Sequence, residues 1–219
     1  IVKSYDPQGV ISGEGAMTKD LIQVADVDFR NVNITSIAAV FVIILISFGS
    51  ASIPVLLVGA IESAIAINMG IPYFTGTQLP FVASIVVGTI QLGATVDYAI
   101  LTTTRFKEEL EKGAGVKEAA HIAVEQCSQS ILTSGLTFFA ATASVAAISQ
   151  MELISSLCHL ISRGALISMA VIILILPALL IVFAPVIAHT TRRWPKPGKA
   201  EAAPAQHGAF AFHKTRKEV

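Results

Sequence analysis

An acidic residue and a tyrosine stand side by side in a long apolar stretch of the sequence. Asp97 and Tyr98 lie within a run of apolar and small residues from Phe81 to about Thr104, which is long enough for one helix to cross a bilayer. A carboxylate in the middle of such a helix costs about 2.5–3.5 kcal/mol to insert, so a charge there marks a functional site by default. The Tyr98 hydroxyl can donate a hydrogen bond to a carboxylate or pass on a proton. We therefore predict that Asp97 and Tyr98 form a proton relay.

Three small polar residues are predicted to support this pair. Thr95 shares a helical face with Tyr98. Ser134 and Thr137 belong to a stripe of small residues, whose spacing lets another backbone approach closely. The stripe consists of Ser130, Ser134, Thr137, Ala141 and Ser144. The alternative for Asp97 is a packing role, in which it pairs with a serine of a neighbouring helix.

Two further charged residues could act in the membrane. Glu62 could join the proton path, but we favour a bracing role between helices, because the residues three and four positions away are apolar or small. Arg163 is predicted to anchor a helix at the membrane interface. Its alternative is to pair with a carboxylate outside the membrane.

The sequence gives little support to an enzyme. A serine nucleophile needs a base within hydrogen-bond reach, whereas Ser134 and His159 are expected near opposite edges of the membrane. Asp97 is the one aspartate expected in a span, although an intramembrane aspartyl protease needs two. Cys127 and Cys158 lack zinc-type spacing. We expect no cofactor, no metal and no nucleic-acid partner, with protons as the coupling ion.

The elements that position these residues are membrane helices. The chain has 219 residues, a mean hydropathy of +0.71 and 14% charged residues, where a soluble domain has about a quarter. The predicted class is an all-α polytopic membrane protein. Its five spans are expected at about 34–48, 53–69, 81–104, 128–148 and 164–187.

The remaining segments are predicted to lie outside the bilayer. Residues 1–33 suggest a lead-in helix after the end of an extracytoplasmic domain, as if cut from a longer chain. Residues 107–126 suggest an amphipathic helix along the membrane surface, and residues 151–163 an interfacial segment. Pro177 should kink or loosen the last span. The tail, 188–219, is predicted to be disordered and basic.

Basic residues predict the orientation. The connection from 105 to 126 has four Lys and Arg residues and the tail has seven, whereas the loops after the second and fourth spans have none before Arg163. Lys and Arg concentrate in cytoplasmic loops. We therefore expect a multi-pass protein of the cell membrane with a cytoplasmic tail and an extracytoplasmic N-terminal segment.

Several stretches together resemble one transporter family. The chain resembles the second half of an MMPL-type transporter of the resistance–nodulation–division superfamily, from about residue 10 to 186. The stretches that carry the similarity are SIPVLL (52–57), INMGIP (67–72), QLGATVDYAI (91–100), TRF (104–106), SGLTFFAAT (134–142) and RGALIS (163–168).

The resemblance implies a transporter of twelve helices in two similar halves, of which this chain is the last five. It also implies that an Asp-Tyr pair in each half meets at the centre of the bundle and carries protons. Asp97 and Tyr98 match the second-half pair. The expected partners are the N-terminal half or a homologous subunit, membrane lipids and an amphipathic cargo.

Two functions follow as competing hypotheses. The first is the membrane half of a proton-driven exporter of lipid-like or hydrophobic compounds. The second is a non-transporting module, similar to the sterol-sensing bundles of the same superfamily, which binds lipid or a partner protein. Asp97 distinguishes them, because a pump needs an ionisable group there and a binding module should tolerate asparagine.

Overall fold

The computed structural model describes residues 13–77 and 81–191, and this part of the chain is helical without a strand. The helices are α2 (Glu14–Phe48), α3 (Ser52–Thr75), α4 (Phe81–Glu111), α5 (Val116–Ile148), α6 (Glu152–Ala170), the π-helical segment η1 (Val171–Ile175) and α7 (Leu176–Thr190). Within the described residues, five helical stretches are long and apolar enough to cross a membrane. This confirms the predicted polytopic all-α class. Residues 192–219 of the predicted basic tail and residues 1–12 of the predicted N-terminal segment lie outside the described residues, whereas α7 continues to Thr190, past the predicted start of the tail at 188.

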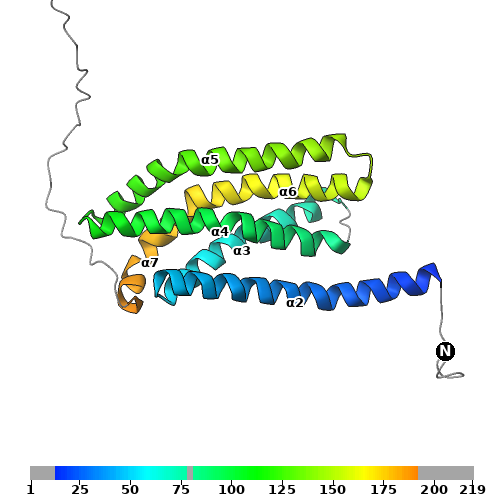
Figure 1. Ribbon diagram of the computed structural model, residues 1–219, viewed down its shortest axis with the longest axis horizontal. Coiled ribbons are helices and arrows are strands. Elements are labelled where there is room, and N and C mark those ends of the chain that lie inside the picture. Colours follow the sequence, from blue (N-terminus) through cyan, green and yellow to red (C-terminus); the bar gives the residue numbers. More distant parts are fainter. Residues whose placement is uncertain (1–12, 78–80, 192–219) are drawn as a thin grey trace, which may run out of the picture.

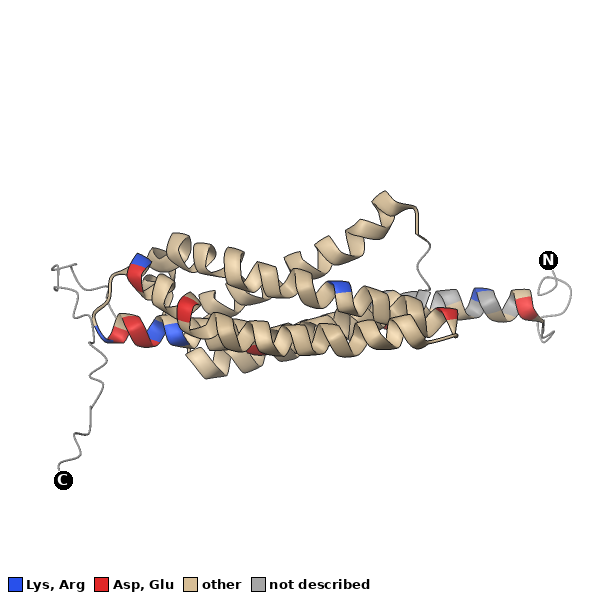
Figure 2. Cartoon of the chain, turned by 90° about the horizontal axis from the view of Figure 1, so that it is seen from above, with Lys and Arg blue, Asp and Glu red and all other residues tan. Residues whose placement is uncertain are grey.

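The long helices run side by side in one elongated bundle (Figure 1). α5 lies along one side, α6 and α4 follow, α3 passes behind α4, and α2 lies along the opposite side. The α5–α6 turn and the start of α2 are at one end of the bundle, and the α4–α5 turn and the end of α7 are at the other. Charged residues are sparse along the middle of the bundle and more frequent toward its ends (Figure 2), as expected for a protein that spans a bilayer.

Hydrogen bonds close the end of the bundle near α7. Gly49 ends α2 in the left-handed conformation at φ 60°, which a residue without Cβ adopts at little cost, and its N–H donates to the Leu45 carbonyl. The following turn then meets the end of α7, because Ser52 Oγ lies 2.7 Å from Thr190 Oγ1 and Thr191 Oγ1 lies 2.7 Å from Ser50 Oγ. The α2–α3 turn and the start of α3 are thus tied to the end of α7.

The first three spans are longer than predicted. The lead-in helix and the first span form one helix, α2, and the apolar span within it begins at Val27 instead of residue 34. α3 continues to Thr75 instead of ending at 69, passing through Pro72. α4 continues through its charged end to Glu111 instead of ending at 104. Polar side chains at the end of a helix do not stop it, since helix ends are set by caps and turn residues.

Two segments that were predicted to lie at the membrane interface differ from the expected secondary structure. Residues 107–126 do not form a separate surface helix, because a turn at 112–115 divides them between the end of α4 and the start of α5. α5 begins at Val116 instead of 128, since the chain has no glycine or proline between Gly115 and residue 128. Residues 151–163 likewise join the last span, which runs from Glu152 to Thr190 without leaving the helix. The prediction for Pro177 is confirmed, because the π-helical segment η1 ends two residues before it.

Candidate functional site

Asp97 lies near the middle of the candidate span Ile85–Glu111, on a face of α4 that the described chain leaves open. Gly93, Asp97 and Leu101 recur every four residues on this face, and all three are exposed. Among the residues that the structure describes, none forms a hydrogen bond or an ion pair with the Asp97 carboxylate. A carboxylate in mid-span is costly in lipid, so this face needs another polypeptide or water to cover it.

Tyr98 points away from that open face and toward α5. Its Oη donates to Ser134 Oγ at 3.0 Å, so the expected hydrogen bond from Tyr98 to Asp97 is absent among the described residues. The two residues are neighbours on a helix and therefore point about 100° apart, and the nearest hydroxyl in the direction of Tyr98 belongs to α5. Asp97 thus lies on the open face of α4, whereas its neighbour Tyr98 takes part in the contact between α4 and α5.

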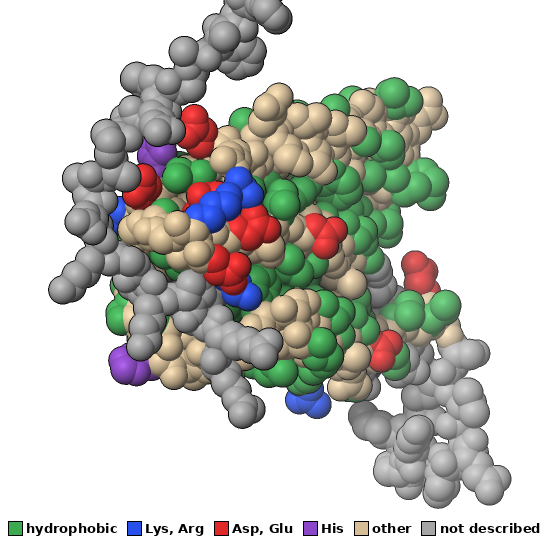
Figure 3. Space-filling model, turned by 60° about the vertical axis from the view of Figure 1, so that its left-hand side comes forward, with side chains coloured by type: hydrophobic (Ala, Val, Ile, Leu, Met, Phe, Trp, Pro, Cys, Tyr) green, Lys and Arg blue, Asp and Glu red, His purple; other side chains and the backbone are tan. Residues whose placement is uncertain are grey.

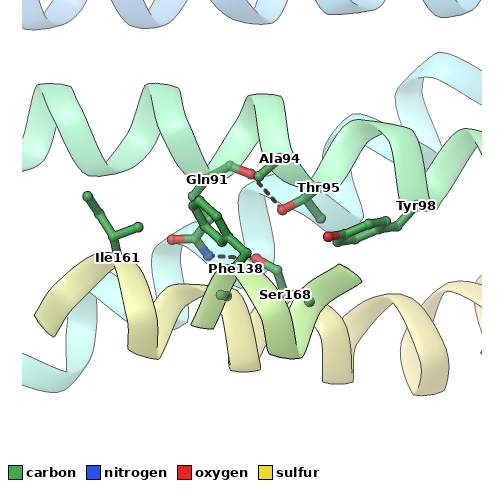
Figure 4. A pocket seen from close by; sticks show the side chains of 9 residues that line it. Gln91, Ala94, Thr95, Tyr98, Phe138, Ile161 and Ser168 are labelled. Carbon is green, nitrogen blue, oxygen red and sulfur yellow. Dashed lines mark hydrogen bonds between the residues drawn. The ribbon is translucent and has the colours of Figure 1, made fainter. Parts of the chain in front are cut away.

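A small cavity lies beside the Tyr98 ring (Figure 4). It measures about 10 Å³, roughly the room that one water molecule needs. Its polar groups come from α4 and α6: Gln91, Thr95, Tyr98 and Ser168. Thr95 Oγ1 is satisfied within its own helix, because it donates to the Gln91 carbonyl at 2.6 Å. Thr95 therefore lies next to Tyr98 as predicted, but it does not contact Asp97 through a hydrogen bond.

Two buried amides join three spans just beyond this cavity. Asn68 of α3 donates from Nδ2 to Gln91 Oε1 of α4 at 2.9 Å and to the Leu160 carbonyl of α6 at 3.1 Å. Gln91 donates from Nε2 to Ser168 Oγ at 2.9 Å. Polar groups in a bilayer must find their partners inside the protein. These contacts therefore fix the relative positions of α3, α4 and α6; we call Asn68, Gln91, Ser168 and Arg163 the amide network.

Arg163 belongs to this network through hydrogen bonds to Asn68, and its predicted role as an interfacial anchor stays a prediction. Its Nε donates to Asn68 Oδ1 at 2.9 Å and its Nη2 to the Asn68 backbone carbonyl at 2.8 Å. The carbonyl is free because Pro72, four residues later, has no N–H to donate. Arg163 thus replaces the helical hydrogen bond that Pro72 removes.

Gly164 makes the amide network possible. A Cβ atom on Gly164 would lie 2.5 Å from Asn68 Nδ2 and 2.6 Å from Gln91 Oε1. Both distances are much shorter than a van der Waals contact, so a side chain at position 164 would push the amide groups of Asn68 and Gln91 out of place. The backbone of α6 must come this close for α3 and α4 to share their hydrogen bonds.

The predicted bracing role of Glu62 finds no hydrogen bond to support it. Oε1 is buried and has no hydrogen-bond partner among the described residues. Glu62 lies in the middle of a 24-residue span. An unpaired buried carboxylate weakens a protein instead of bracing it.

The predicted close packing of the small-residue stripe of α5 is wrong for the described chain. Ser130, Ser134, Thr137, Ala141 and Ser144 are all exposed. Thr137 donates only to the Thr133 carbonyl of its own helix at 2.7 Å. α5 packs on α6 through a different face, where Gly135 approaches the Met169 side chain. Of the stripe, Ser134 alone meets a predicted site residue.

Charged side chains gather where α4 turns into α5 (Figure 3). Arg105 contacts Glu108 at 2.6 Å and Glu109 at 3.1 Å, and Lys112 contacts Glu109 at 2.8 Å. Lys107 and Glu111 form a longer pair at 3.7 Å. Surface pairs of this kind contribute little to stability, but together they mark one polar end of the bundle.

Sequence reasoning missed Asn68 and Gln91 as site residues. Both are large amides within apolar runs, and this is the signal that could have found them, because amides in spans hydrogen-bond across helices. Their partners could not be found in this way, since Arg163 and Asn68 are 95 residues apart.

The fold and the site define a class: a polytopic helical membrane protein with an open carboxylate in mid-span and a buried polar network beside it. The chain matches the MMPL family over residues 6–207. It therefore belongs to the MMPL family, which confirms the predicted resemblance.

Three curated relatives match parts of the chain. A membrane protein of Streptomyces coelicolor is 33% identical over 58% of this chain and 18% of its own length. The mycolic acid-containing lipids exporter MmpL11 of Mycolicibacterium smegmatis is 26% identical over 88% of this chain and 20% of its own length. The probable trehalose monomycolate exporter MmpL3 of Mycobacterium leprae is 26% identical over 80% of this chain and 18% of its own length. The chain thus spans about a fifth of the length of these relatives.

Proposed function

We propose that this chain is the C-terminal membrane part of a proton-driven exporter of lipid-like compounds. The family and the exporters MmpL11 and MmpL3 among its relatives support a role in lipid export. Because the chain covers about a fifth of those relatives, transport is proposed for the complete transporter. The cell membrane is its place of action, with the α5–α6 end outside and the α4–α5 turn in the cytoplasm.

The observation that carries the proposal is the open position of Asp97. Asp97 lies in mid-span on the same face as Gly93, four residues before it. Because a glycine lets another helix approach closely, a second helix can pack on this face and cover the carboxylate. We propose that the other half of the transporter covers this face and completes the proton path. A carboxylate that faced lipid would be costly to insert, and charged residues in spans almost always face protein or a water-filled cavity.

In the proposed cycle, Asp97 gains a proton from the outer side and loses it to the cytoplasm. Protonation removes the charge, so α4 can shift against the helices that cover Asp97. A proton that crosses the membrane releases about 2.3 kcal/mol per 100 mV, which supplies the work of export. Tyr98 is held by Ser134 and lines the small cavity between α4, α5 and α6.

Lipid export by the complete transporter tests this function. Asp97→Asn keeps the shape and hydrogen bonding of the side chain but removes proton exchange, so we expect normal insertion and no export. Asp28→Asn is the matched control, because Asp28 is an exposed aspartate at the start of the apolar part of α2; it should export normally. Continued export by Asp97→Asn would favour the non-transporting, sterol-sensing-like alternative.

A further inference from the structure

Arg163 carries a charge that no described carboxylate balances. Both of its acceptors, Asn68 Oδ1 and the Asn68 carbonyl, are neutral. The ion pairs of the described chain all lie between residues 105 and 125. Glu152 begins the same helix eleven residues earlier, or about 16 Å away along the axis. Ionisable residues in spans pair with another charge, bond to backbone carbonyls or face a cavity. Arg163 has the carbonyl contact, and its charge is left for an anion from outside the described chain to balance.

The guanidinium group lines an open cavity of about 250 Å³ between the end of α3 and α6. Nη1 forms no hydrogen bond with a described residue, whereas Nε and Nη2 hold the group on Asn68. No carboxylate is among the residues that line the cavity. The lining residues are Pro72, Thr75, Thr77, Ser156, His159, Leu160 and Arg163. A guanidinium with hydroxyl groups and an imidazole beside it suits the oxygens of a phosphate.

Two aromatic side chains mark the depth of this cavity in the membrane. Tyr73 and Phe74 lie between the cavity residues Pro72 and Thr75, and each is 87% exposed. Their rings pack edge to face with centroids 5.6 Å apart. Exposed aromatic residues at the end of a span lie at the level of the lipid headgroups. The cavity is therefore at the height where a lipid phosphate is found.

The site is also rigid before a ligand arrives. Asn68 is completely buried, and its amide is fixed by Gln91 and by the Leu160 carbonyl. Arg163 is thus held in one position through two hydrogen bonds to a residue that cannot move freely. A binding group fixed in advance loses less conformational entropy when its ligand binds.

We propose that Arg163 and the hydroxyl groups of this cavity bind the phosphate of an anionic membrane lipid in the leaflet on the α5–α6 side. The acyl chains would lie along the exposed apolar surface beside Tyr73 and Phe74. Asp97 does not line this cavity, so the lipid-site proposal does not depend on the proposed proton relay. Asp97→Asn should leave lipid binding unchanged.

Native mass spectrometry of the complete chain in detergent tests the proposal. The probes are phosphatidylglycerol, which is anionic, and phosphatidylcholine, which is zwitterionic. Arg163→Gln can still donate to Asn68 but lacks the charge, so we expect it to bind phosphatidylglycerol at least about tenfold more weakly, as when a charge-assisted hydrogen bond is lost. Arg163→Lys should keep the preference for the anionic lipid. Arg30→Gln is the matched control, because Arg30 is an exposed arginine of α2 that does not line the cavity, and it should behave as the unchanged chain.

A second variant keeps the test valid if Arg163→Gln does not fold. Ser156→Leu fills the cavity and leaves the hydrogen bonds of Arg163 in place, so it should lose the bound phosphatidylglycerol while remaining folded. The proposal is overturned if Ser156→Leu or a folded Arg163→Gln keeps the full preference, or if Arg30→Gln loses as much. If inorganic phosphate alone bound as tightly as phosphatidylglycerol in the same measurement, the assignment to a lipid would be overturned.

Discussion

A single missing side chain, at Gly164, decides whether the amide network can form. The network requires α6 to approach Asn68 and Gln91 more closely than any Cβ permits. The energetic cost of losing it is shared by three helices, because each amide side chain has three hydrogen-bond partners. A buried polar network stabilises a protein only when all of its members are satisfied.

Gly164→Ala should therefore lower the free energy of unfolding by about 1–3 kcal/mol, the usual cost of overpacking. Thermal unfolding of the purified protein in detergent measures this. Gly88→Ala is the control, because a Cβ at Gly88 meets nothing within 4 Å and alanine favours a helix. Equal stability of the two variants would show that the amides move aside without cost.

Glu62→Gln should keep much of the transport activity of the complete transporter. The carboxylate has a buried oxygen without a described partner, so its replacement breaks no known hydrogen bond and removes a costly charge. We expect the free energy of unfolding to stay the same or to rise. A loss of export as complete as that of Asp97→Asn, at normal expression, would place Glu62 in the proton path.

The sequence predicted which charged residues lie in the membrane but not what they contact. Asp97 and Glu62 were identified because charges are rare in apolar runs. The last span was expected to begin at residue 164, just after Arg163, whereas the helix that contains Arg163 begins at Glu152. The partner of Arg163 is an asparagine 95 residues earlier, and no local pattern gives that distance.

The contact between α4 and α5 at the site depends on one side-chain hydrogen bond, from Tyr98 to Ser134. It joins helices that are otherwise packed through apolar and small residues. Since Ser134 lies on an exposed stripe, this bond is near the edge of the described bundle. The rest of α5 is held mainly by α6.

Tyr98→Phe should weaken export less than Asp97→Asn, because a water molecule can replace the hydroxyl in the cavity beside it. Ser134→Ala should have an effect of similar size, since it removes the same bond. A double-mutant cycle on unfolding should give a coupling energy of about 0.6 kcal/mol, typical of hydrogen bonds between membrane helices. Strictly additive effects of the two substitutions would show that the bond does not contribute.

Helix existence could be predicted, but helix ends could not. The five apolar runs were found because a span needs about 20 apolar residues. The ends failed where a polar stretch remained helical, as in α4 up to Glu111 and in α5 from Val116. Hydropathy reports contact with lipid, whereas a helix continues until a turn residue or a cap ends it. The same reason explains why Glu152–Arg163 joined the last span.

The end of the bundle at the α4–α5 turn has a cluster of paired charges. The basic residues near the α4–α5 turn, Arg105, Lys107 and Lys112, are paired with glutamates. The orientation of a membrane protein follows the number of Lys and Arg residues in each loop, not the net charge. Glutamate contributes little to this rule. We therefore keep the expectation that the α4–α5 turn is cytoplasmic.

Cysteine labelling tests this orientation. In a version without Cys127 and Cys158, a cysteine at Gly113 should react only after the membrane is opened. A cysteine at Thr75, on the other end of the bundle, should react in intact cells. Labelling of position 113 by an impermeant reagent in intact cells would reverse the topology.

The central claim for the whole molecule is that Asp97 exchanges protons when the open face of α4 is covered by the rest of the transporter. Proton flux in proteoliposomes tests it most directly, with the complete transporter, an imposed pH gradient, a pH-sensitive dye inside the vesicles and cargo lipid present. We expect the unchanged transporter and Asp28→Asn to carry protons into the vesicles, and Asp97→Asn to carry none above the leak of empty vesicles. A proton flux through Asp97→Asn equal to that of the unchanged transporter would contradict the claim.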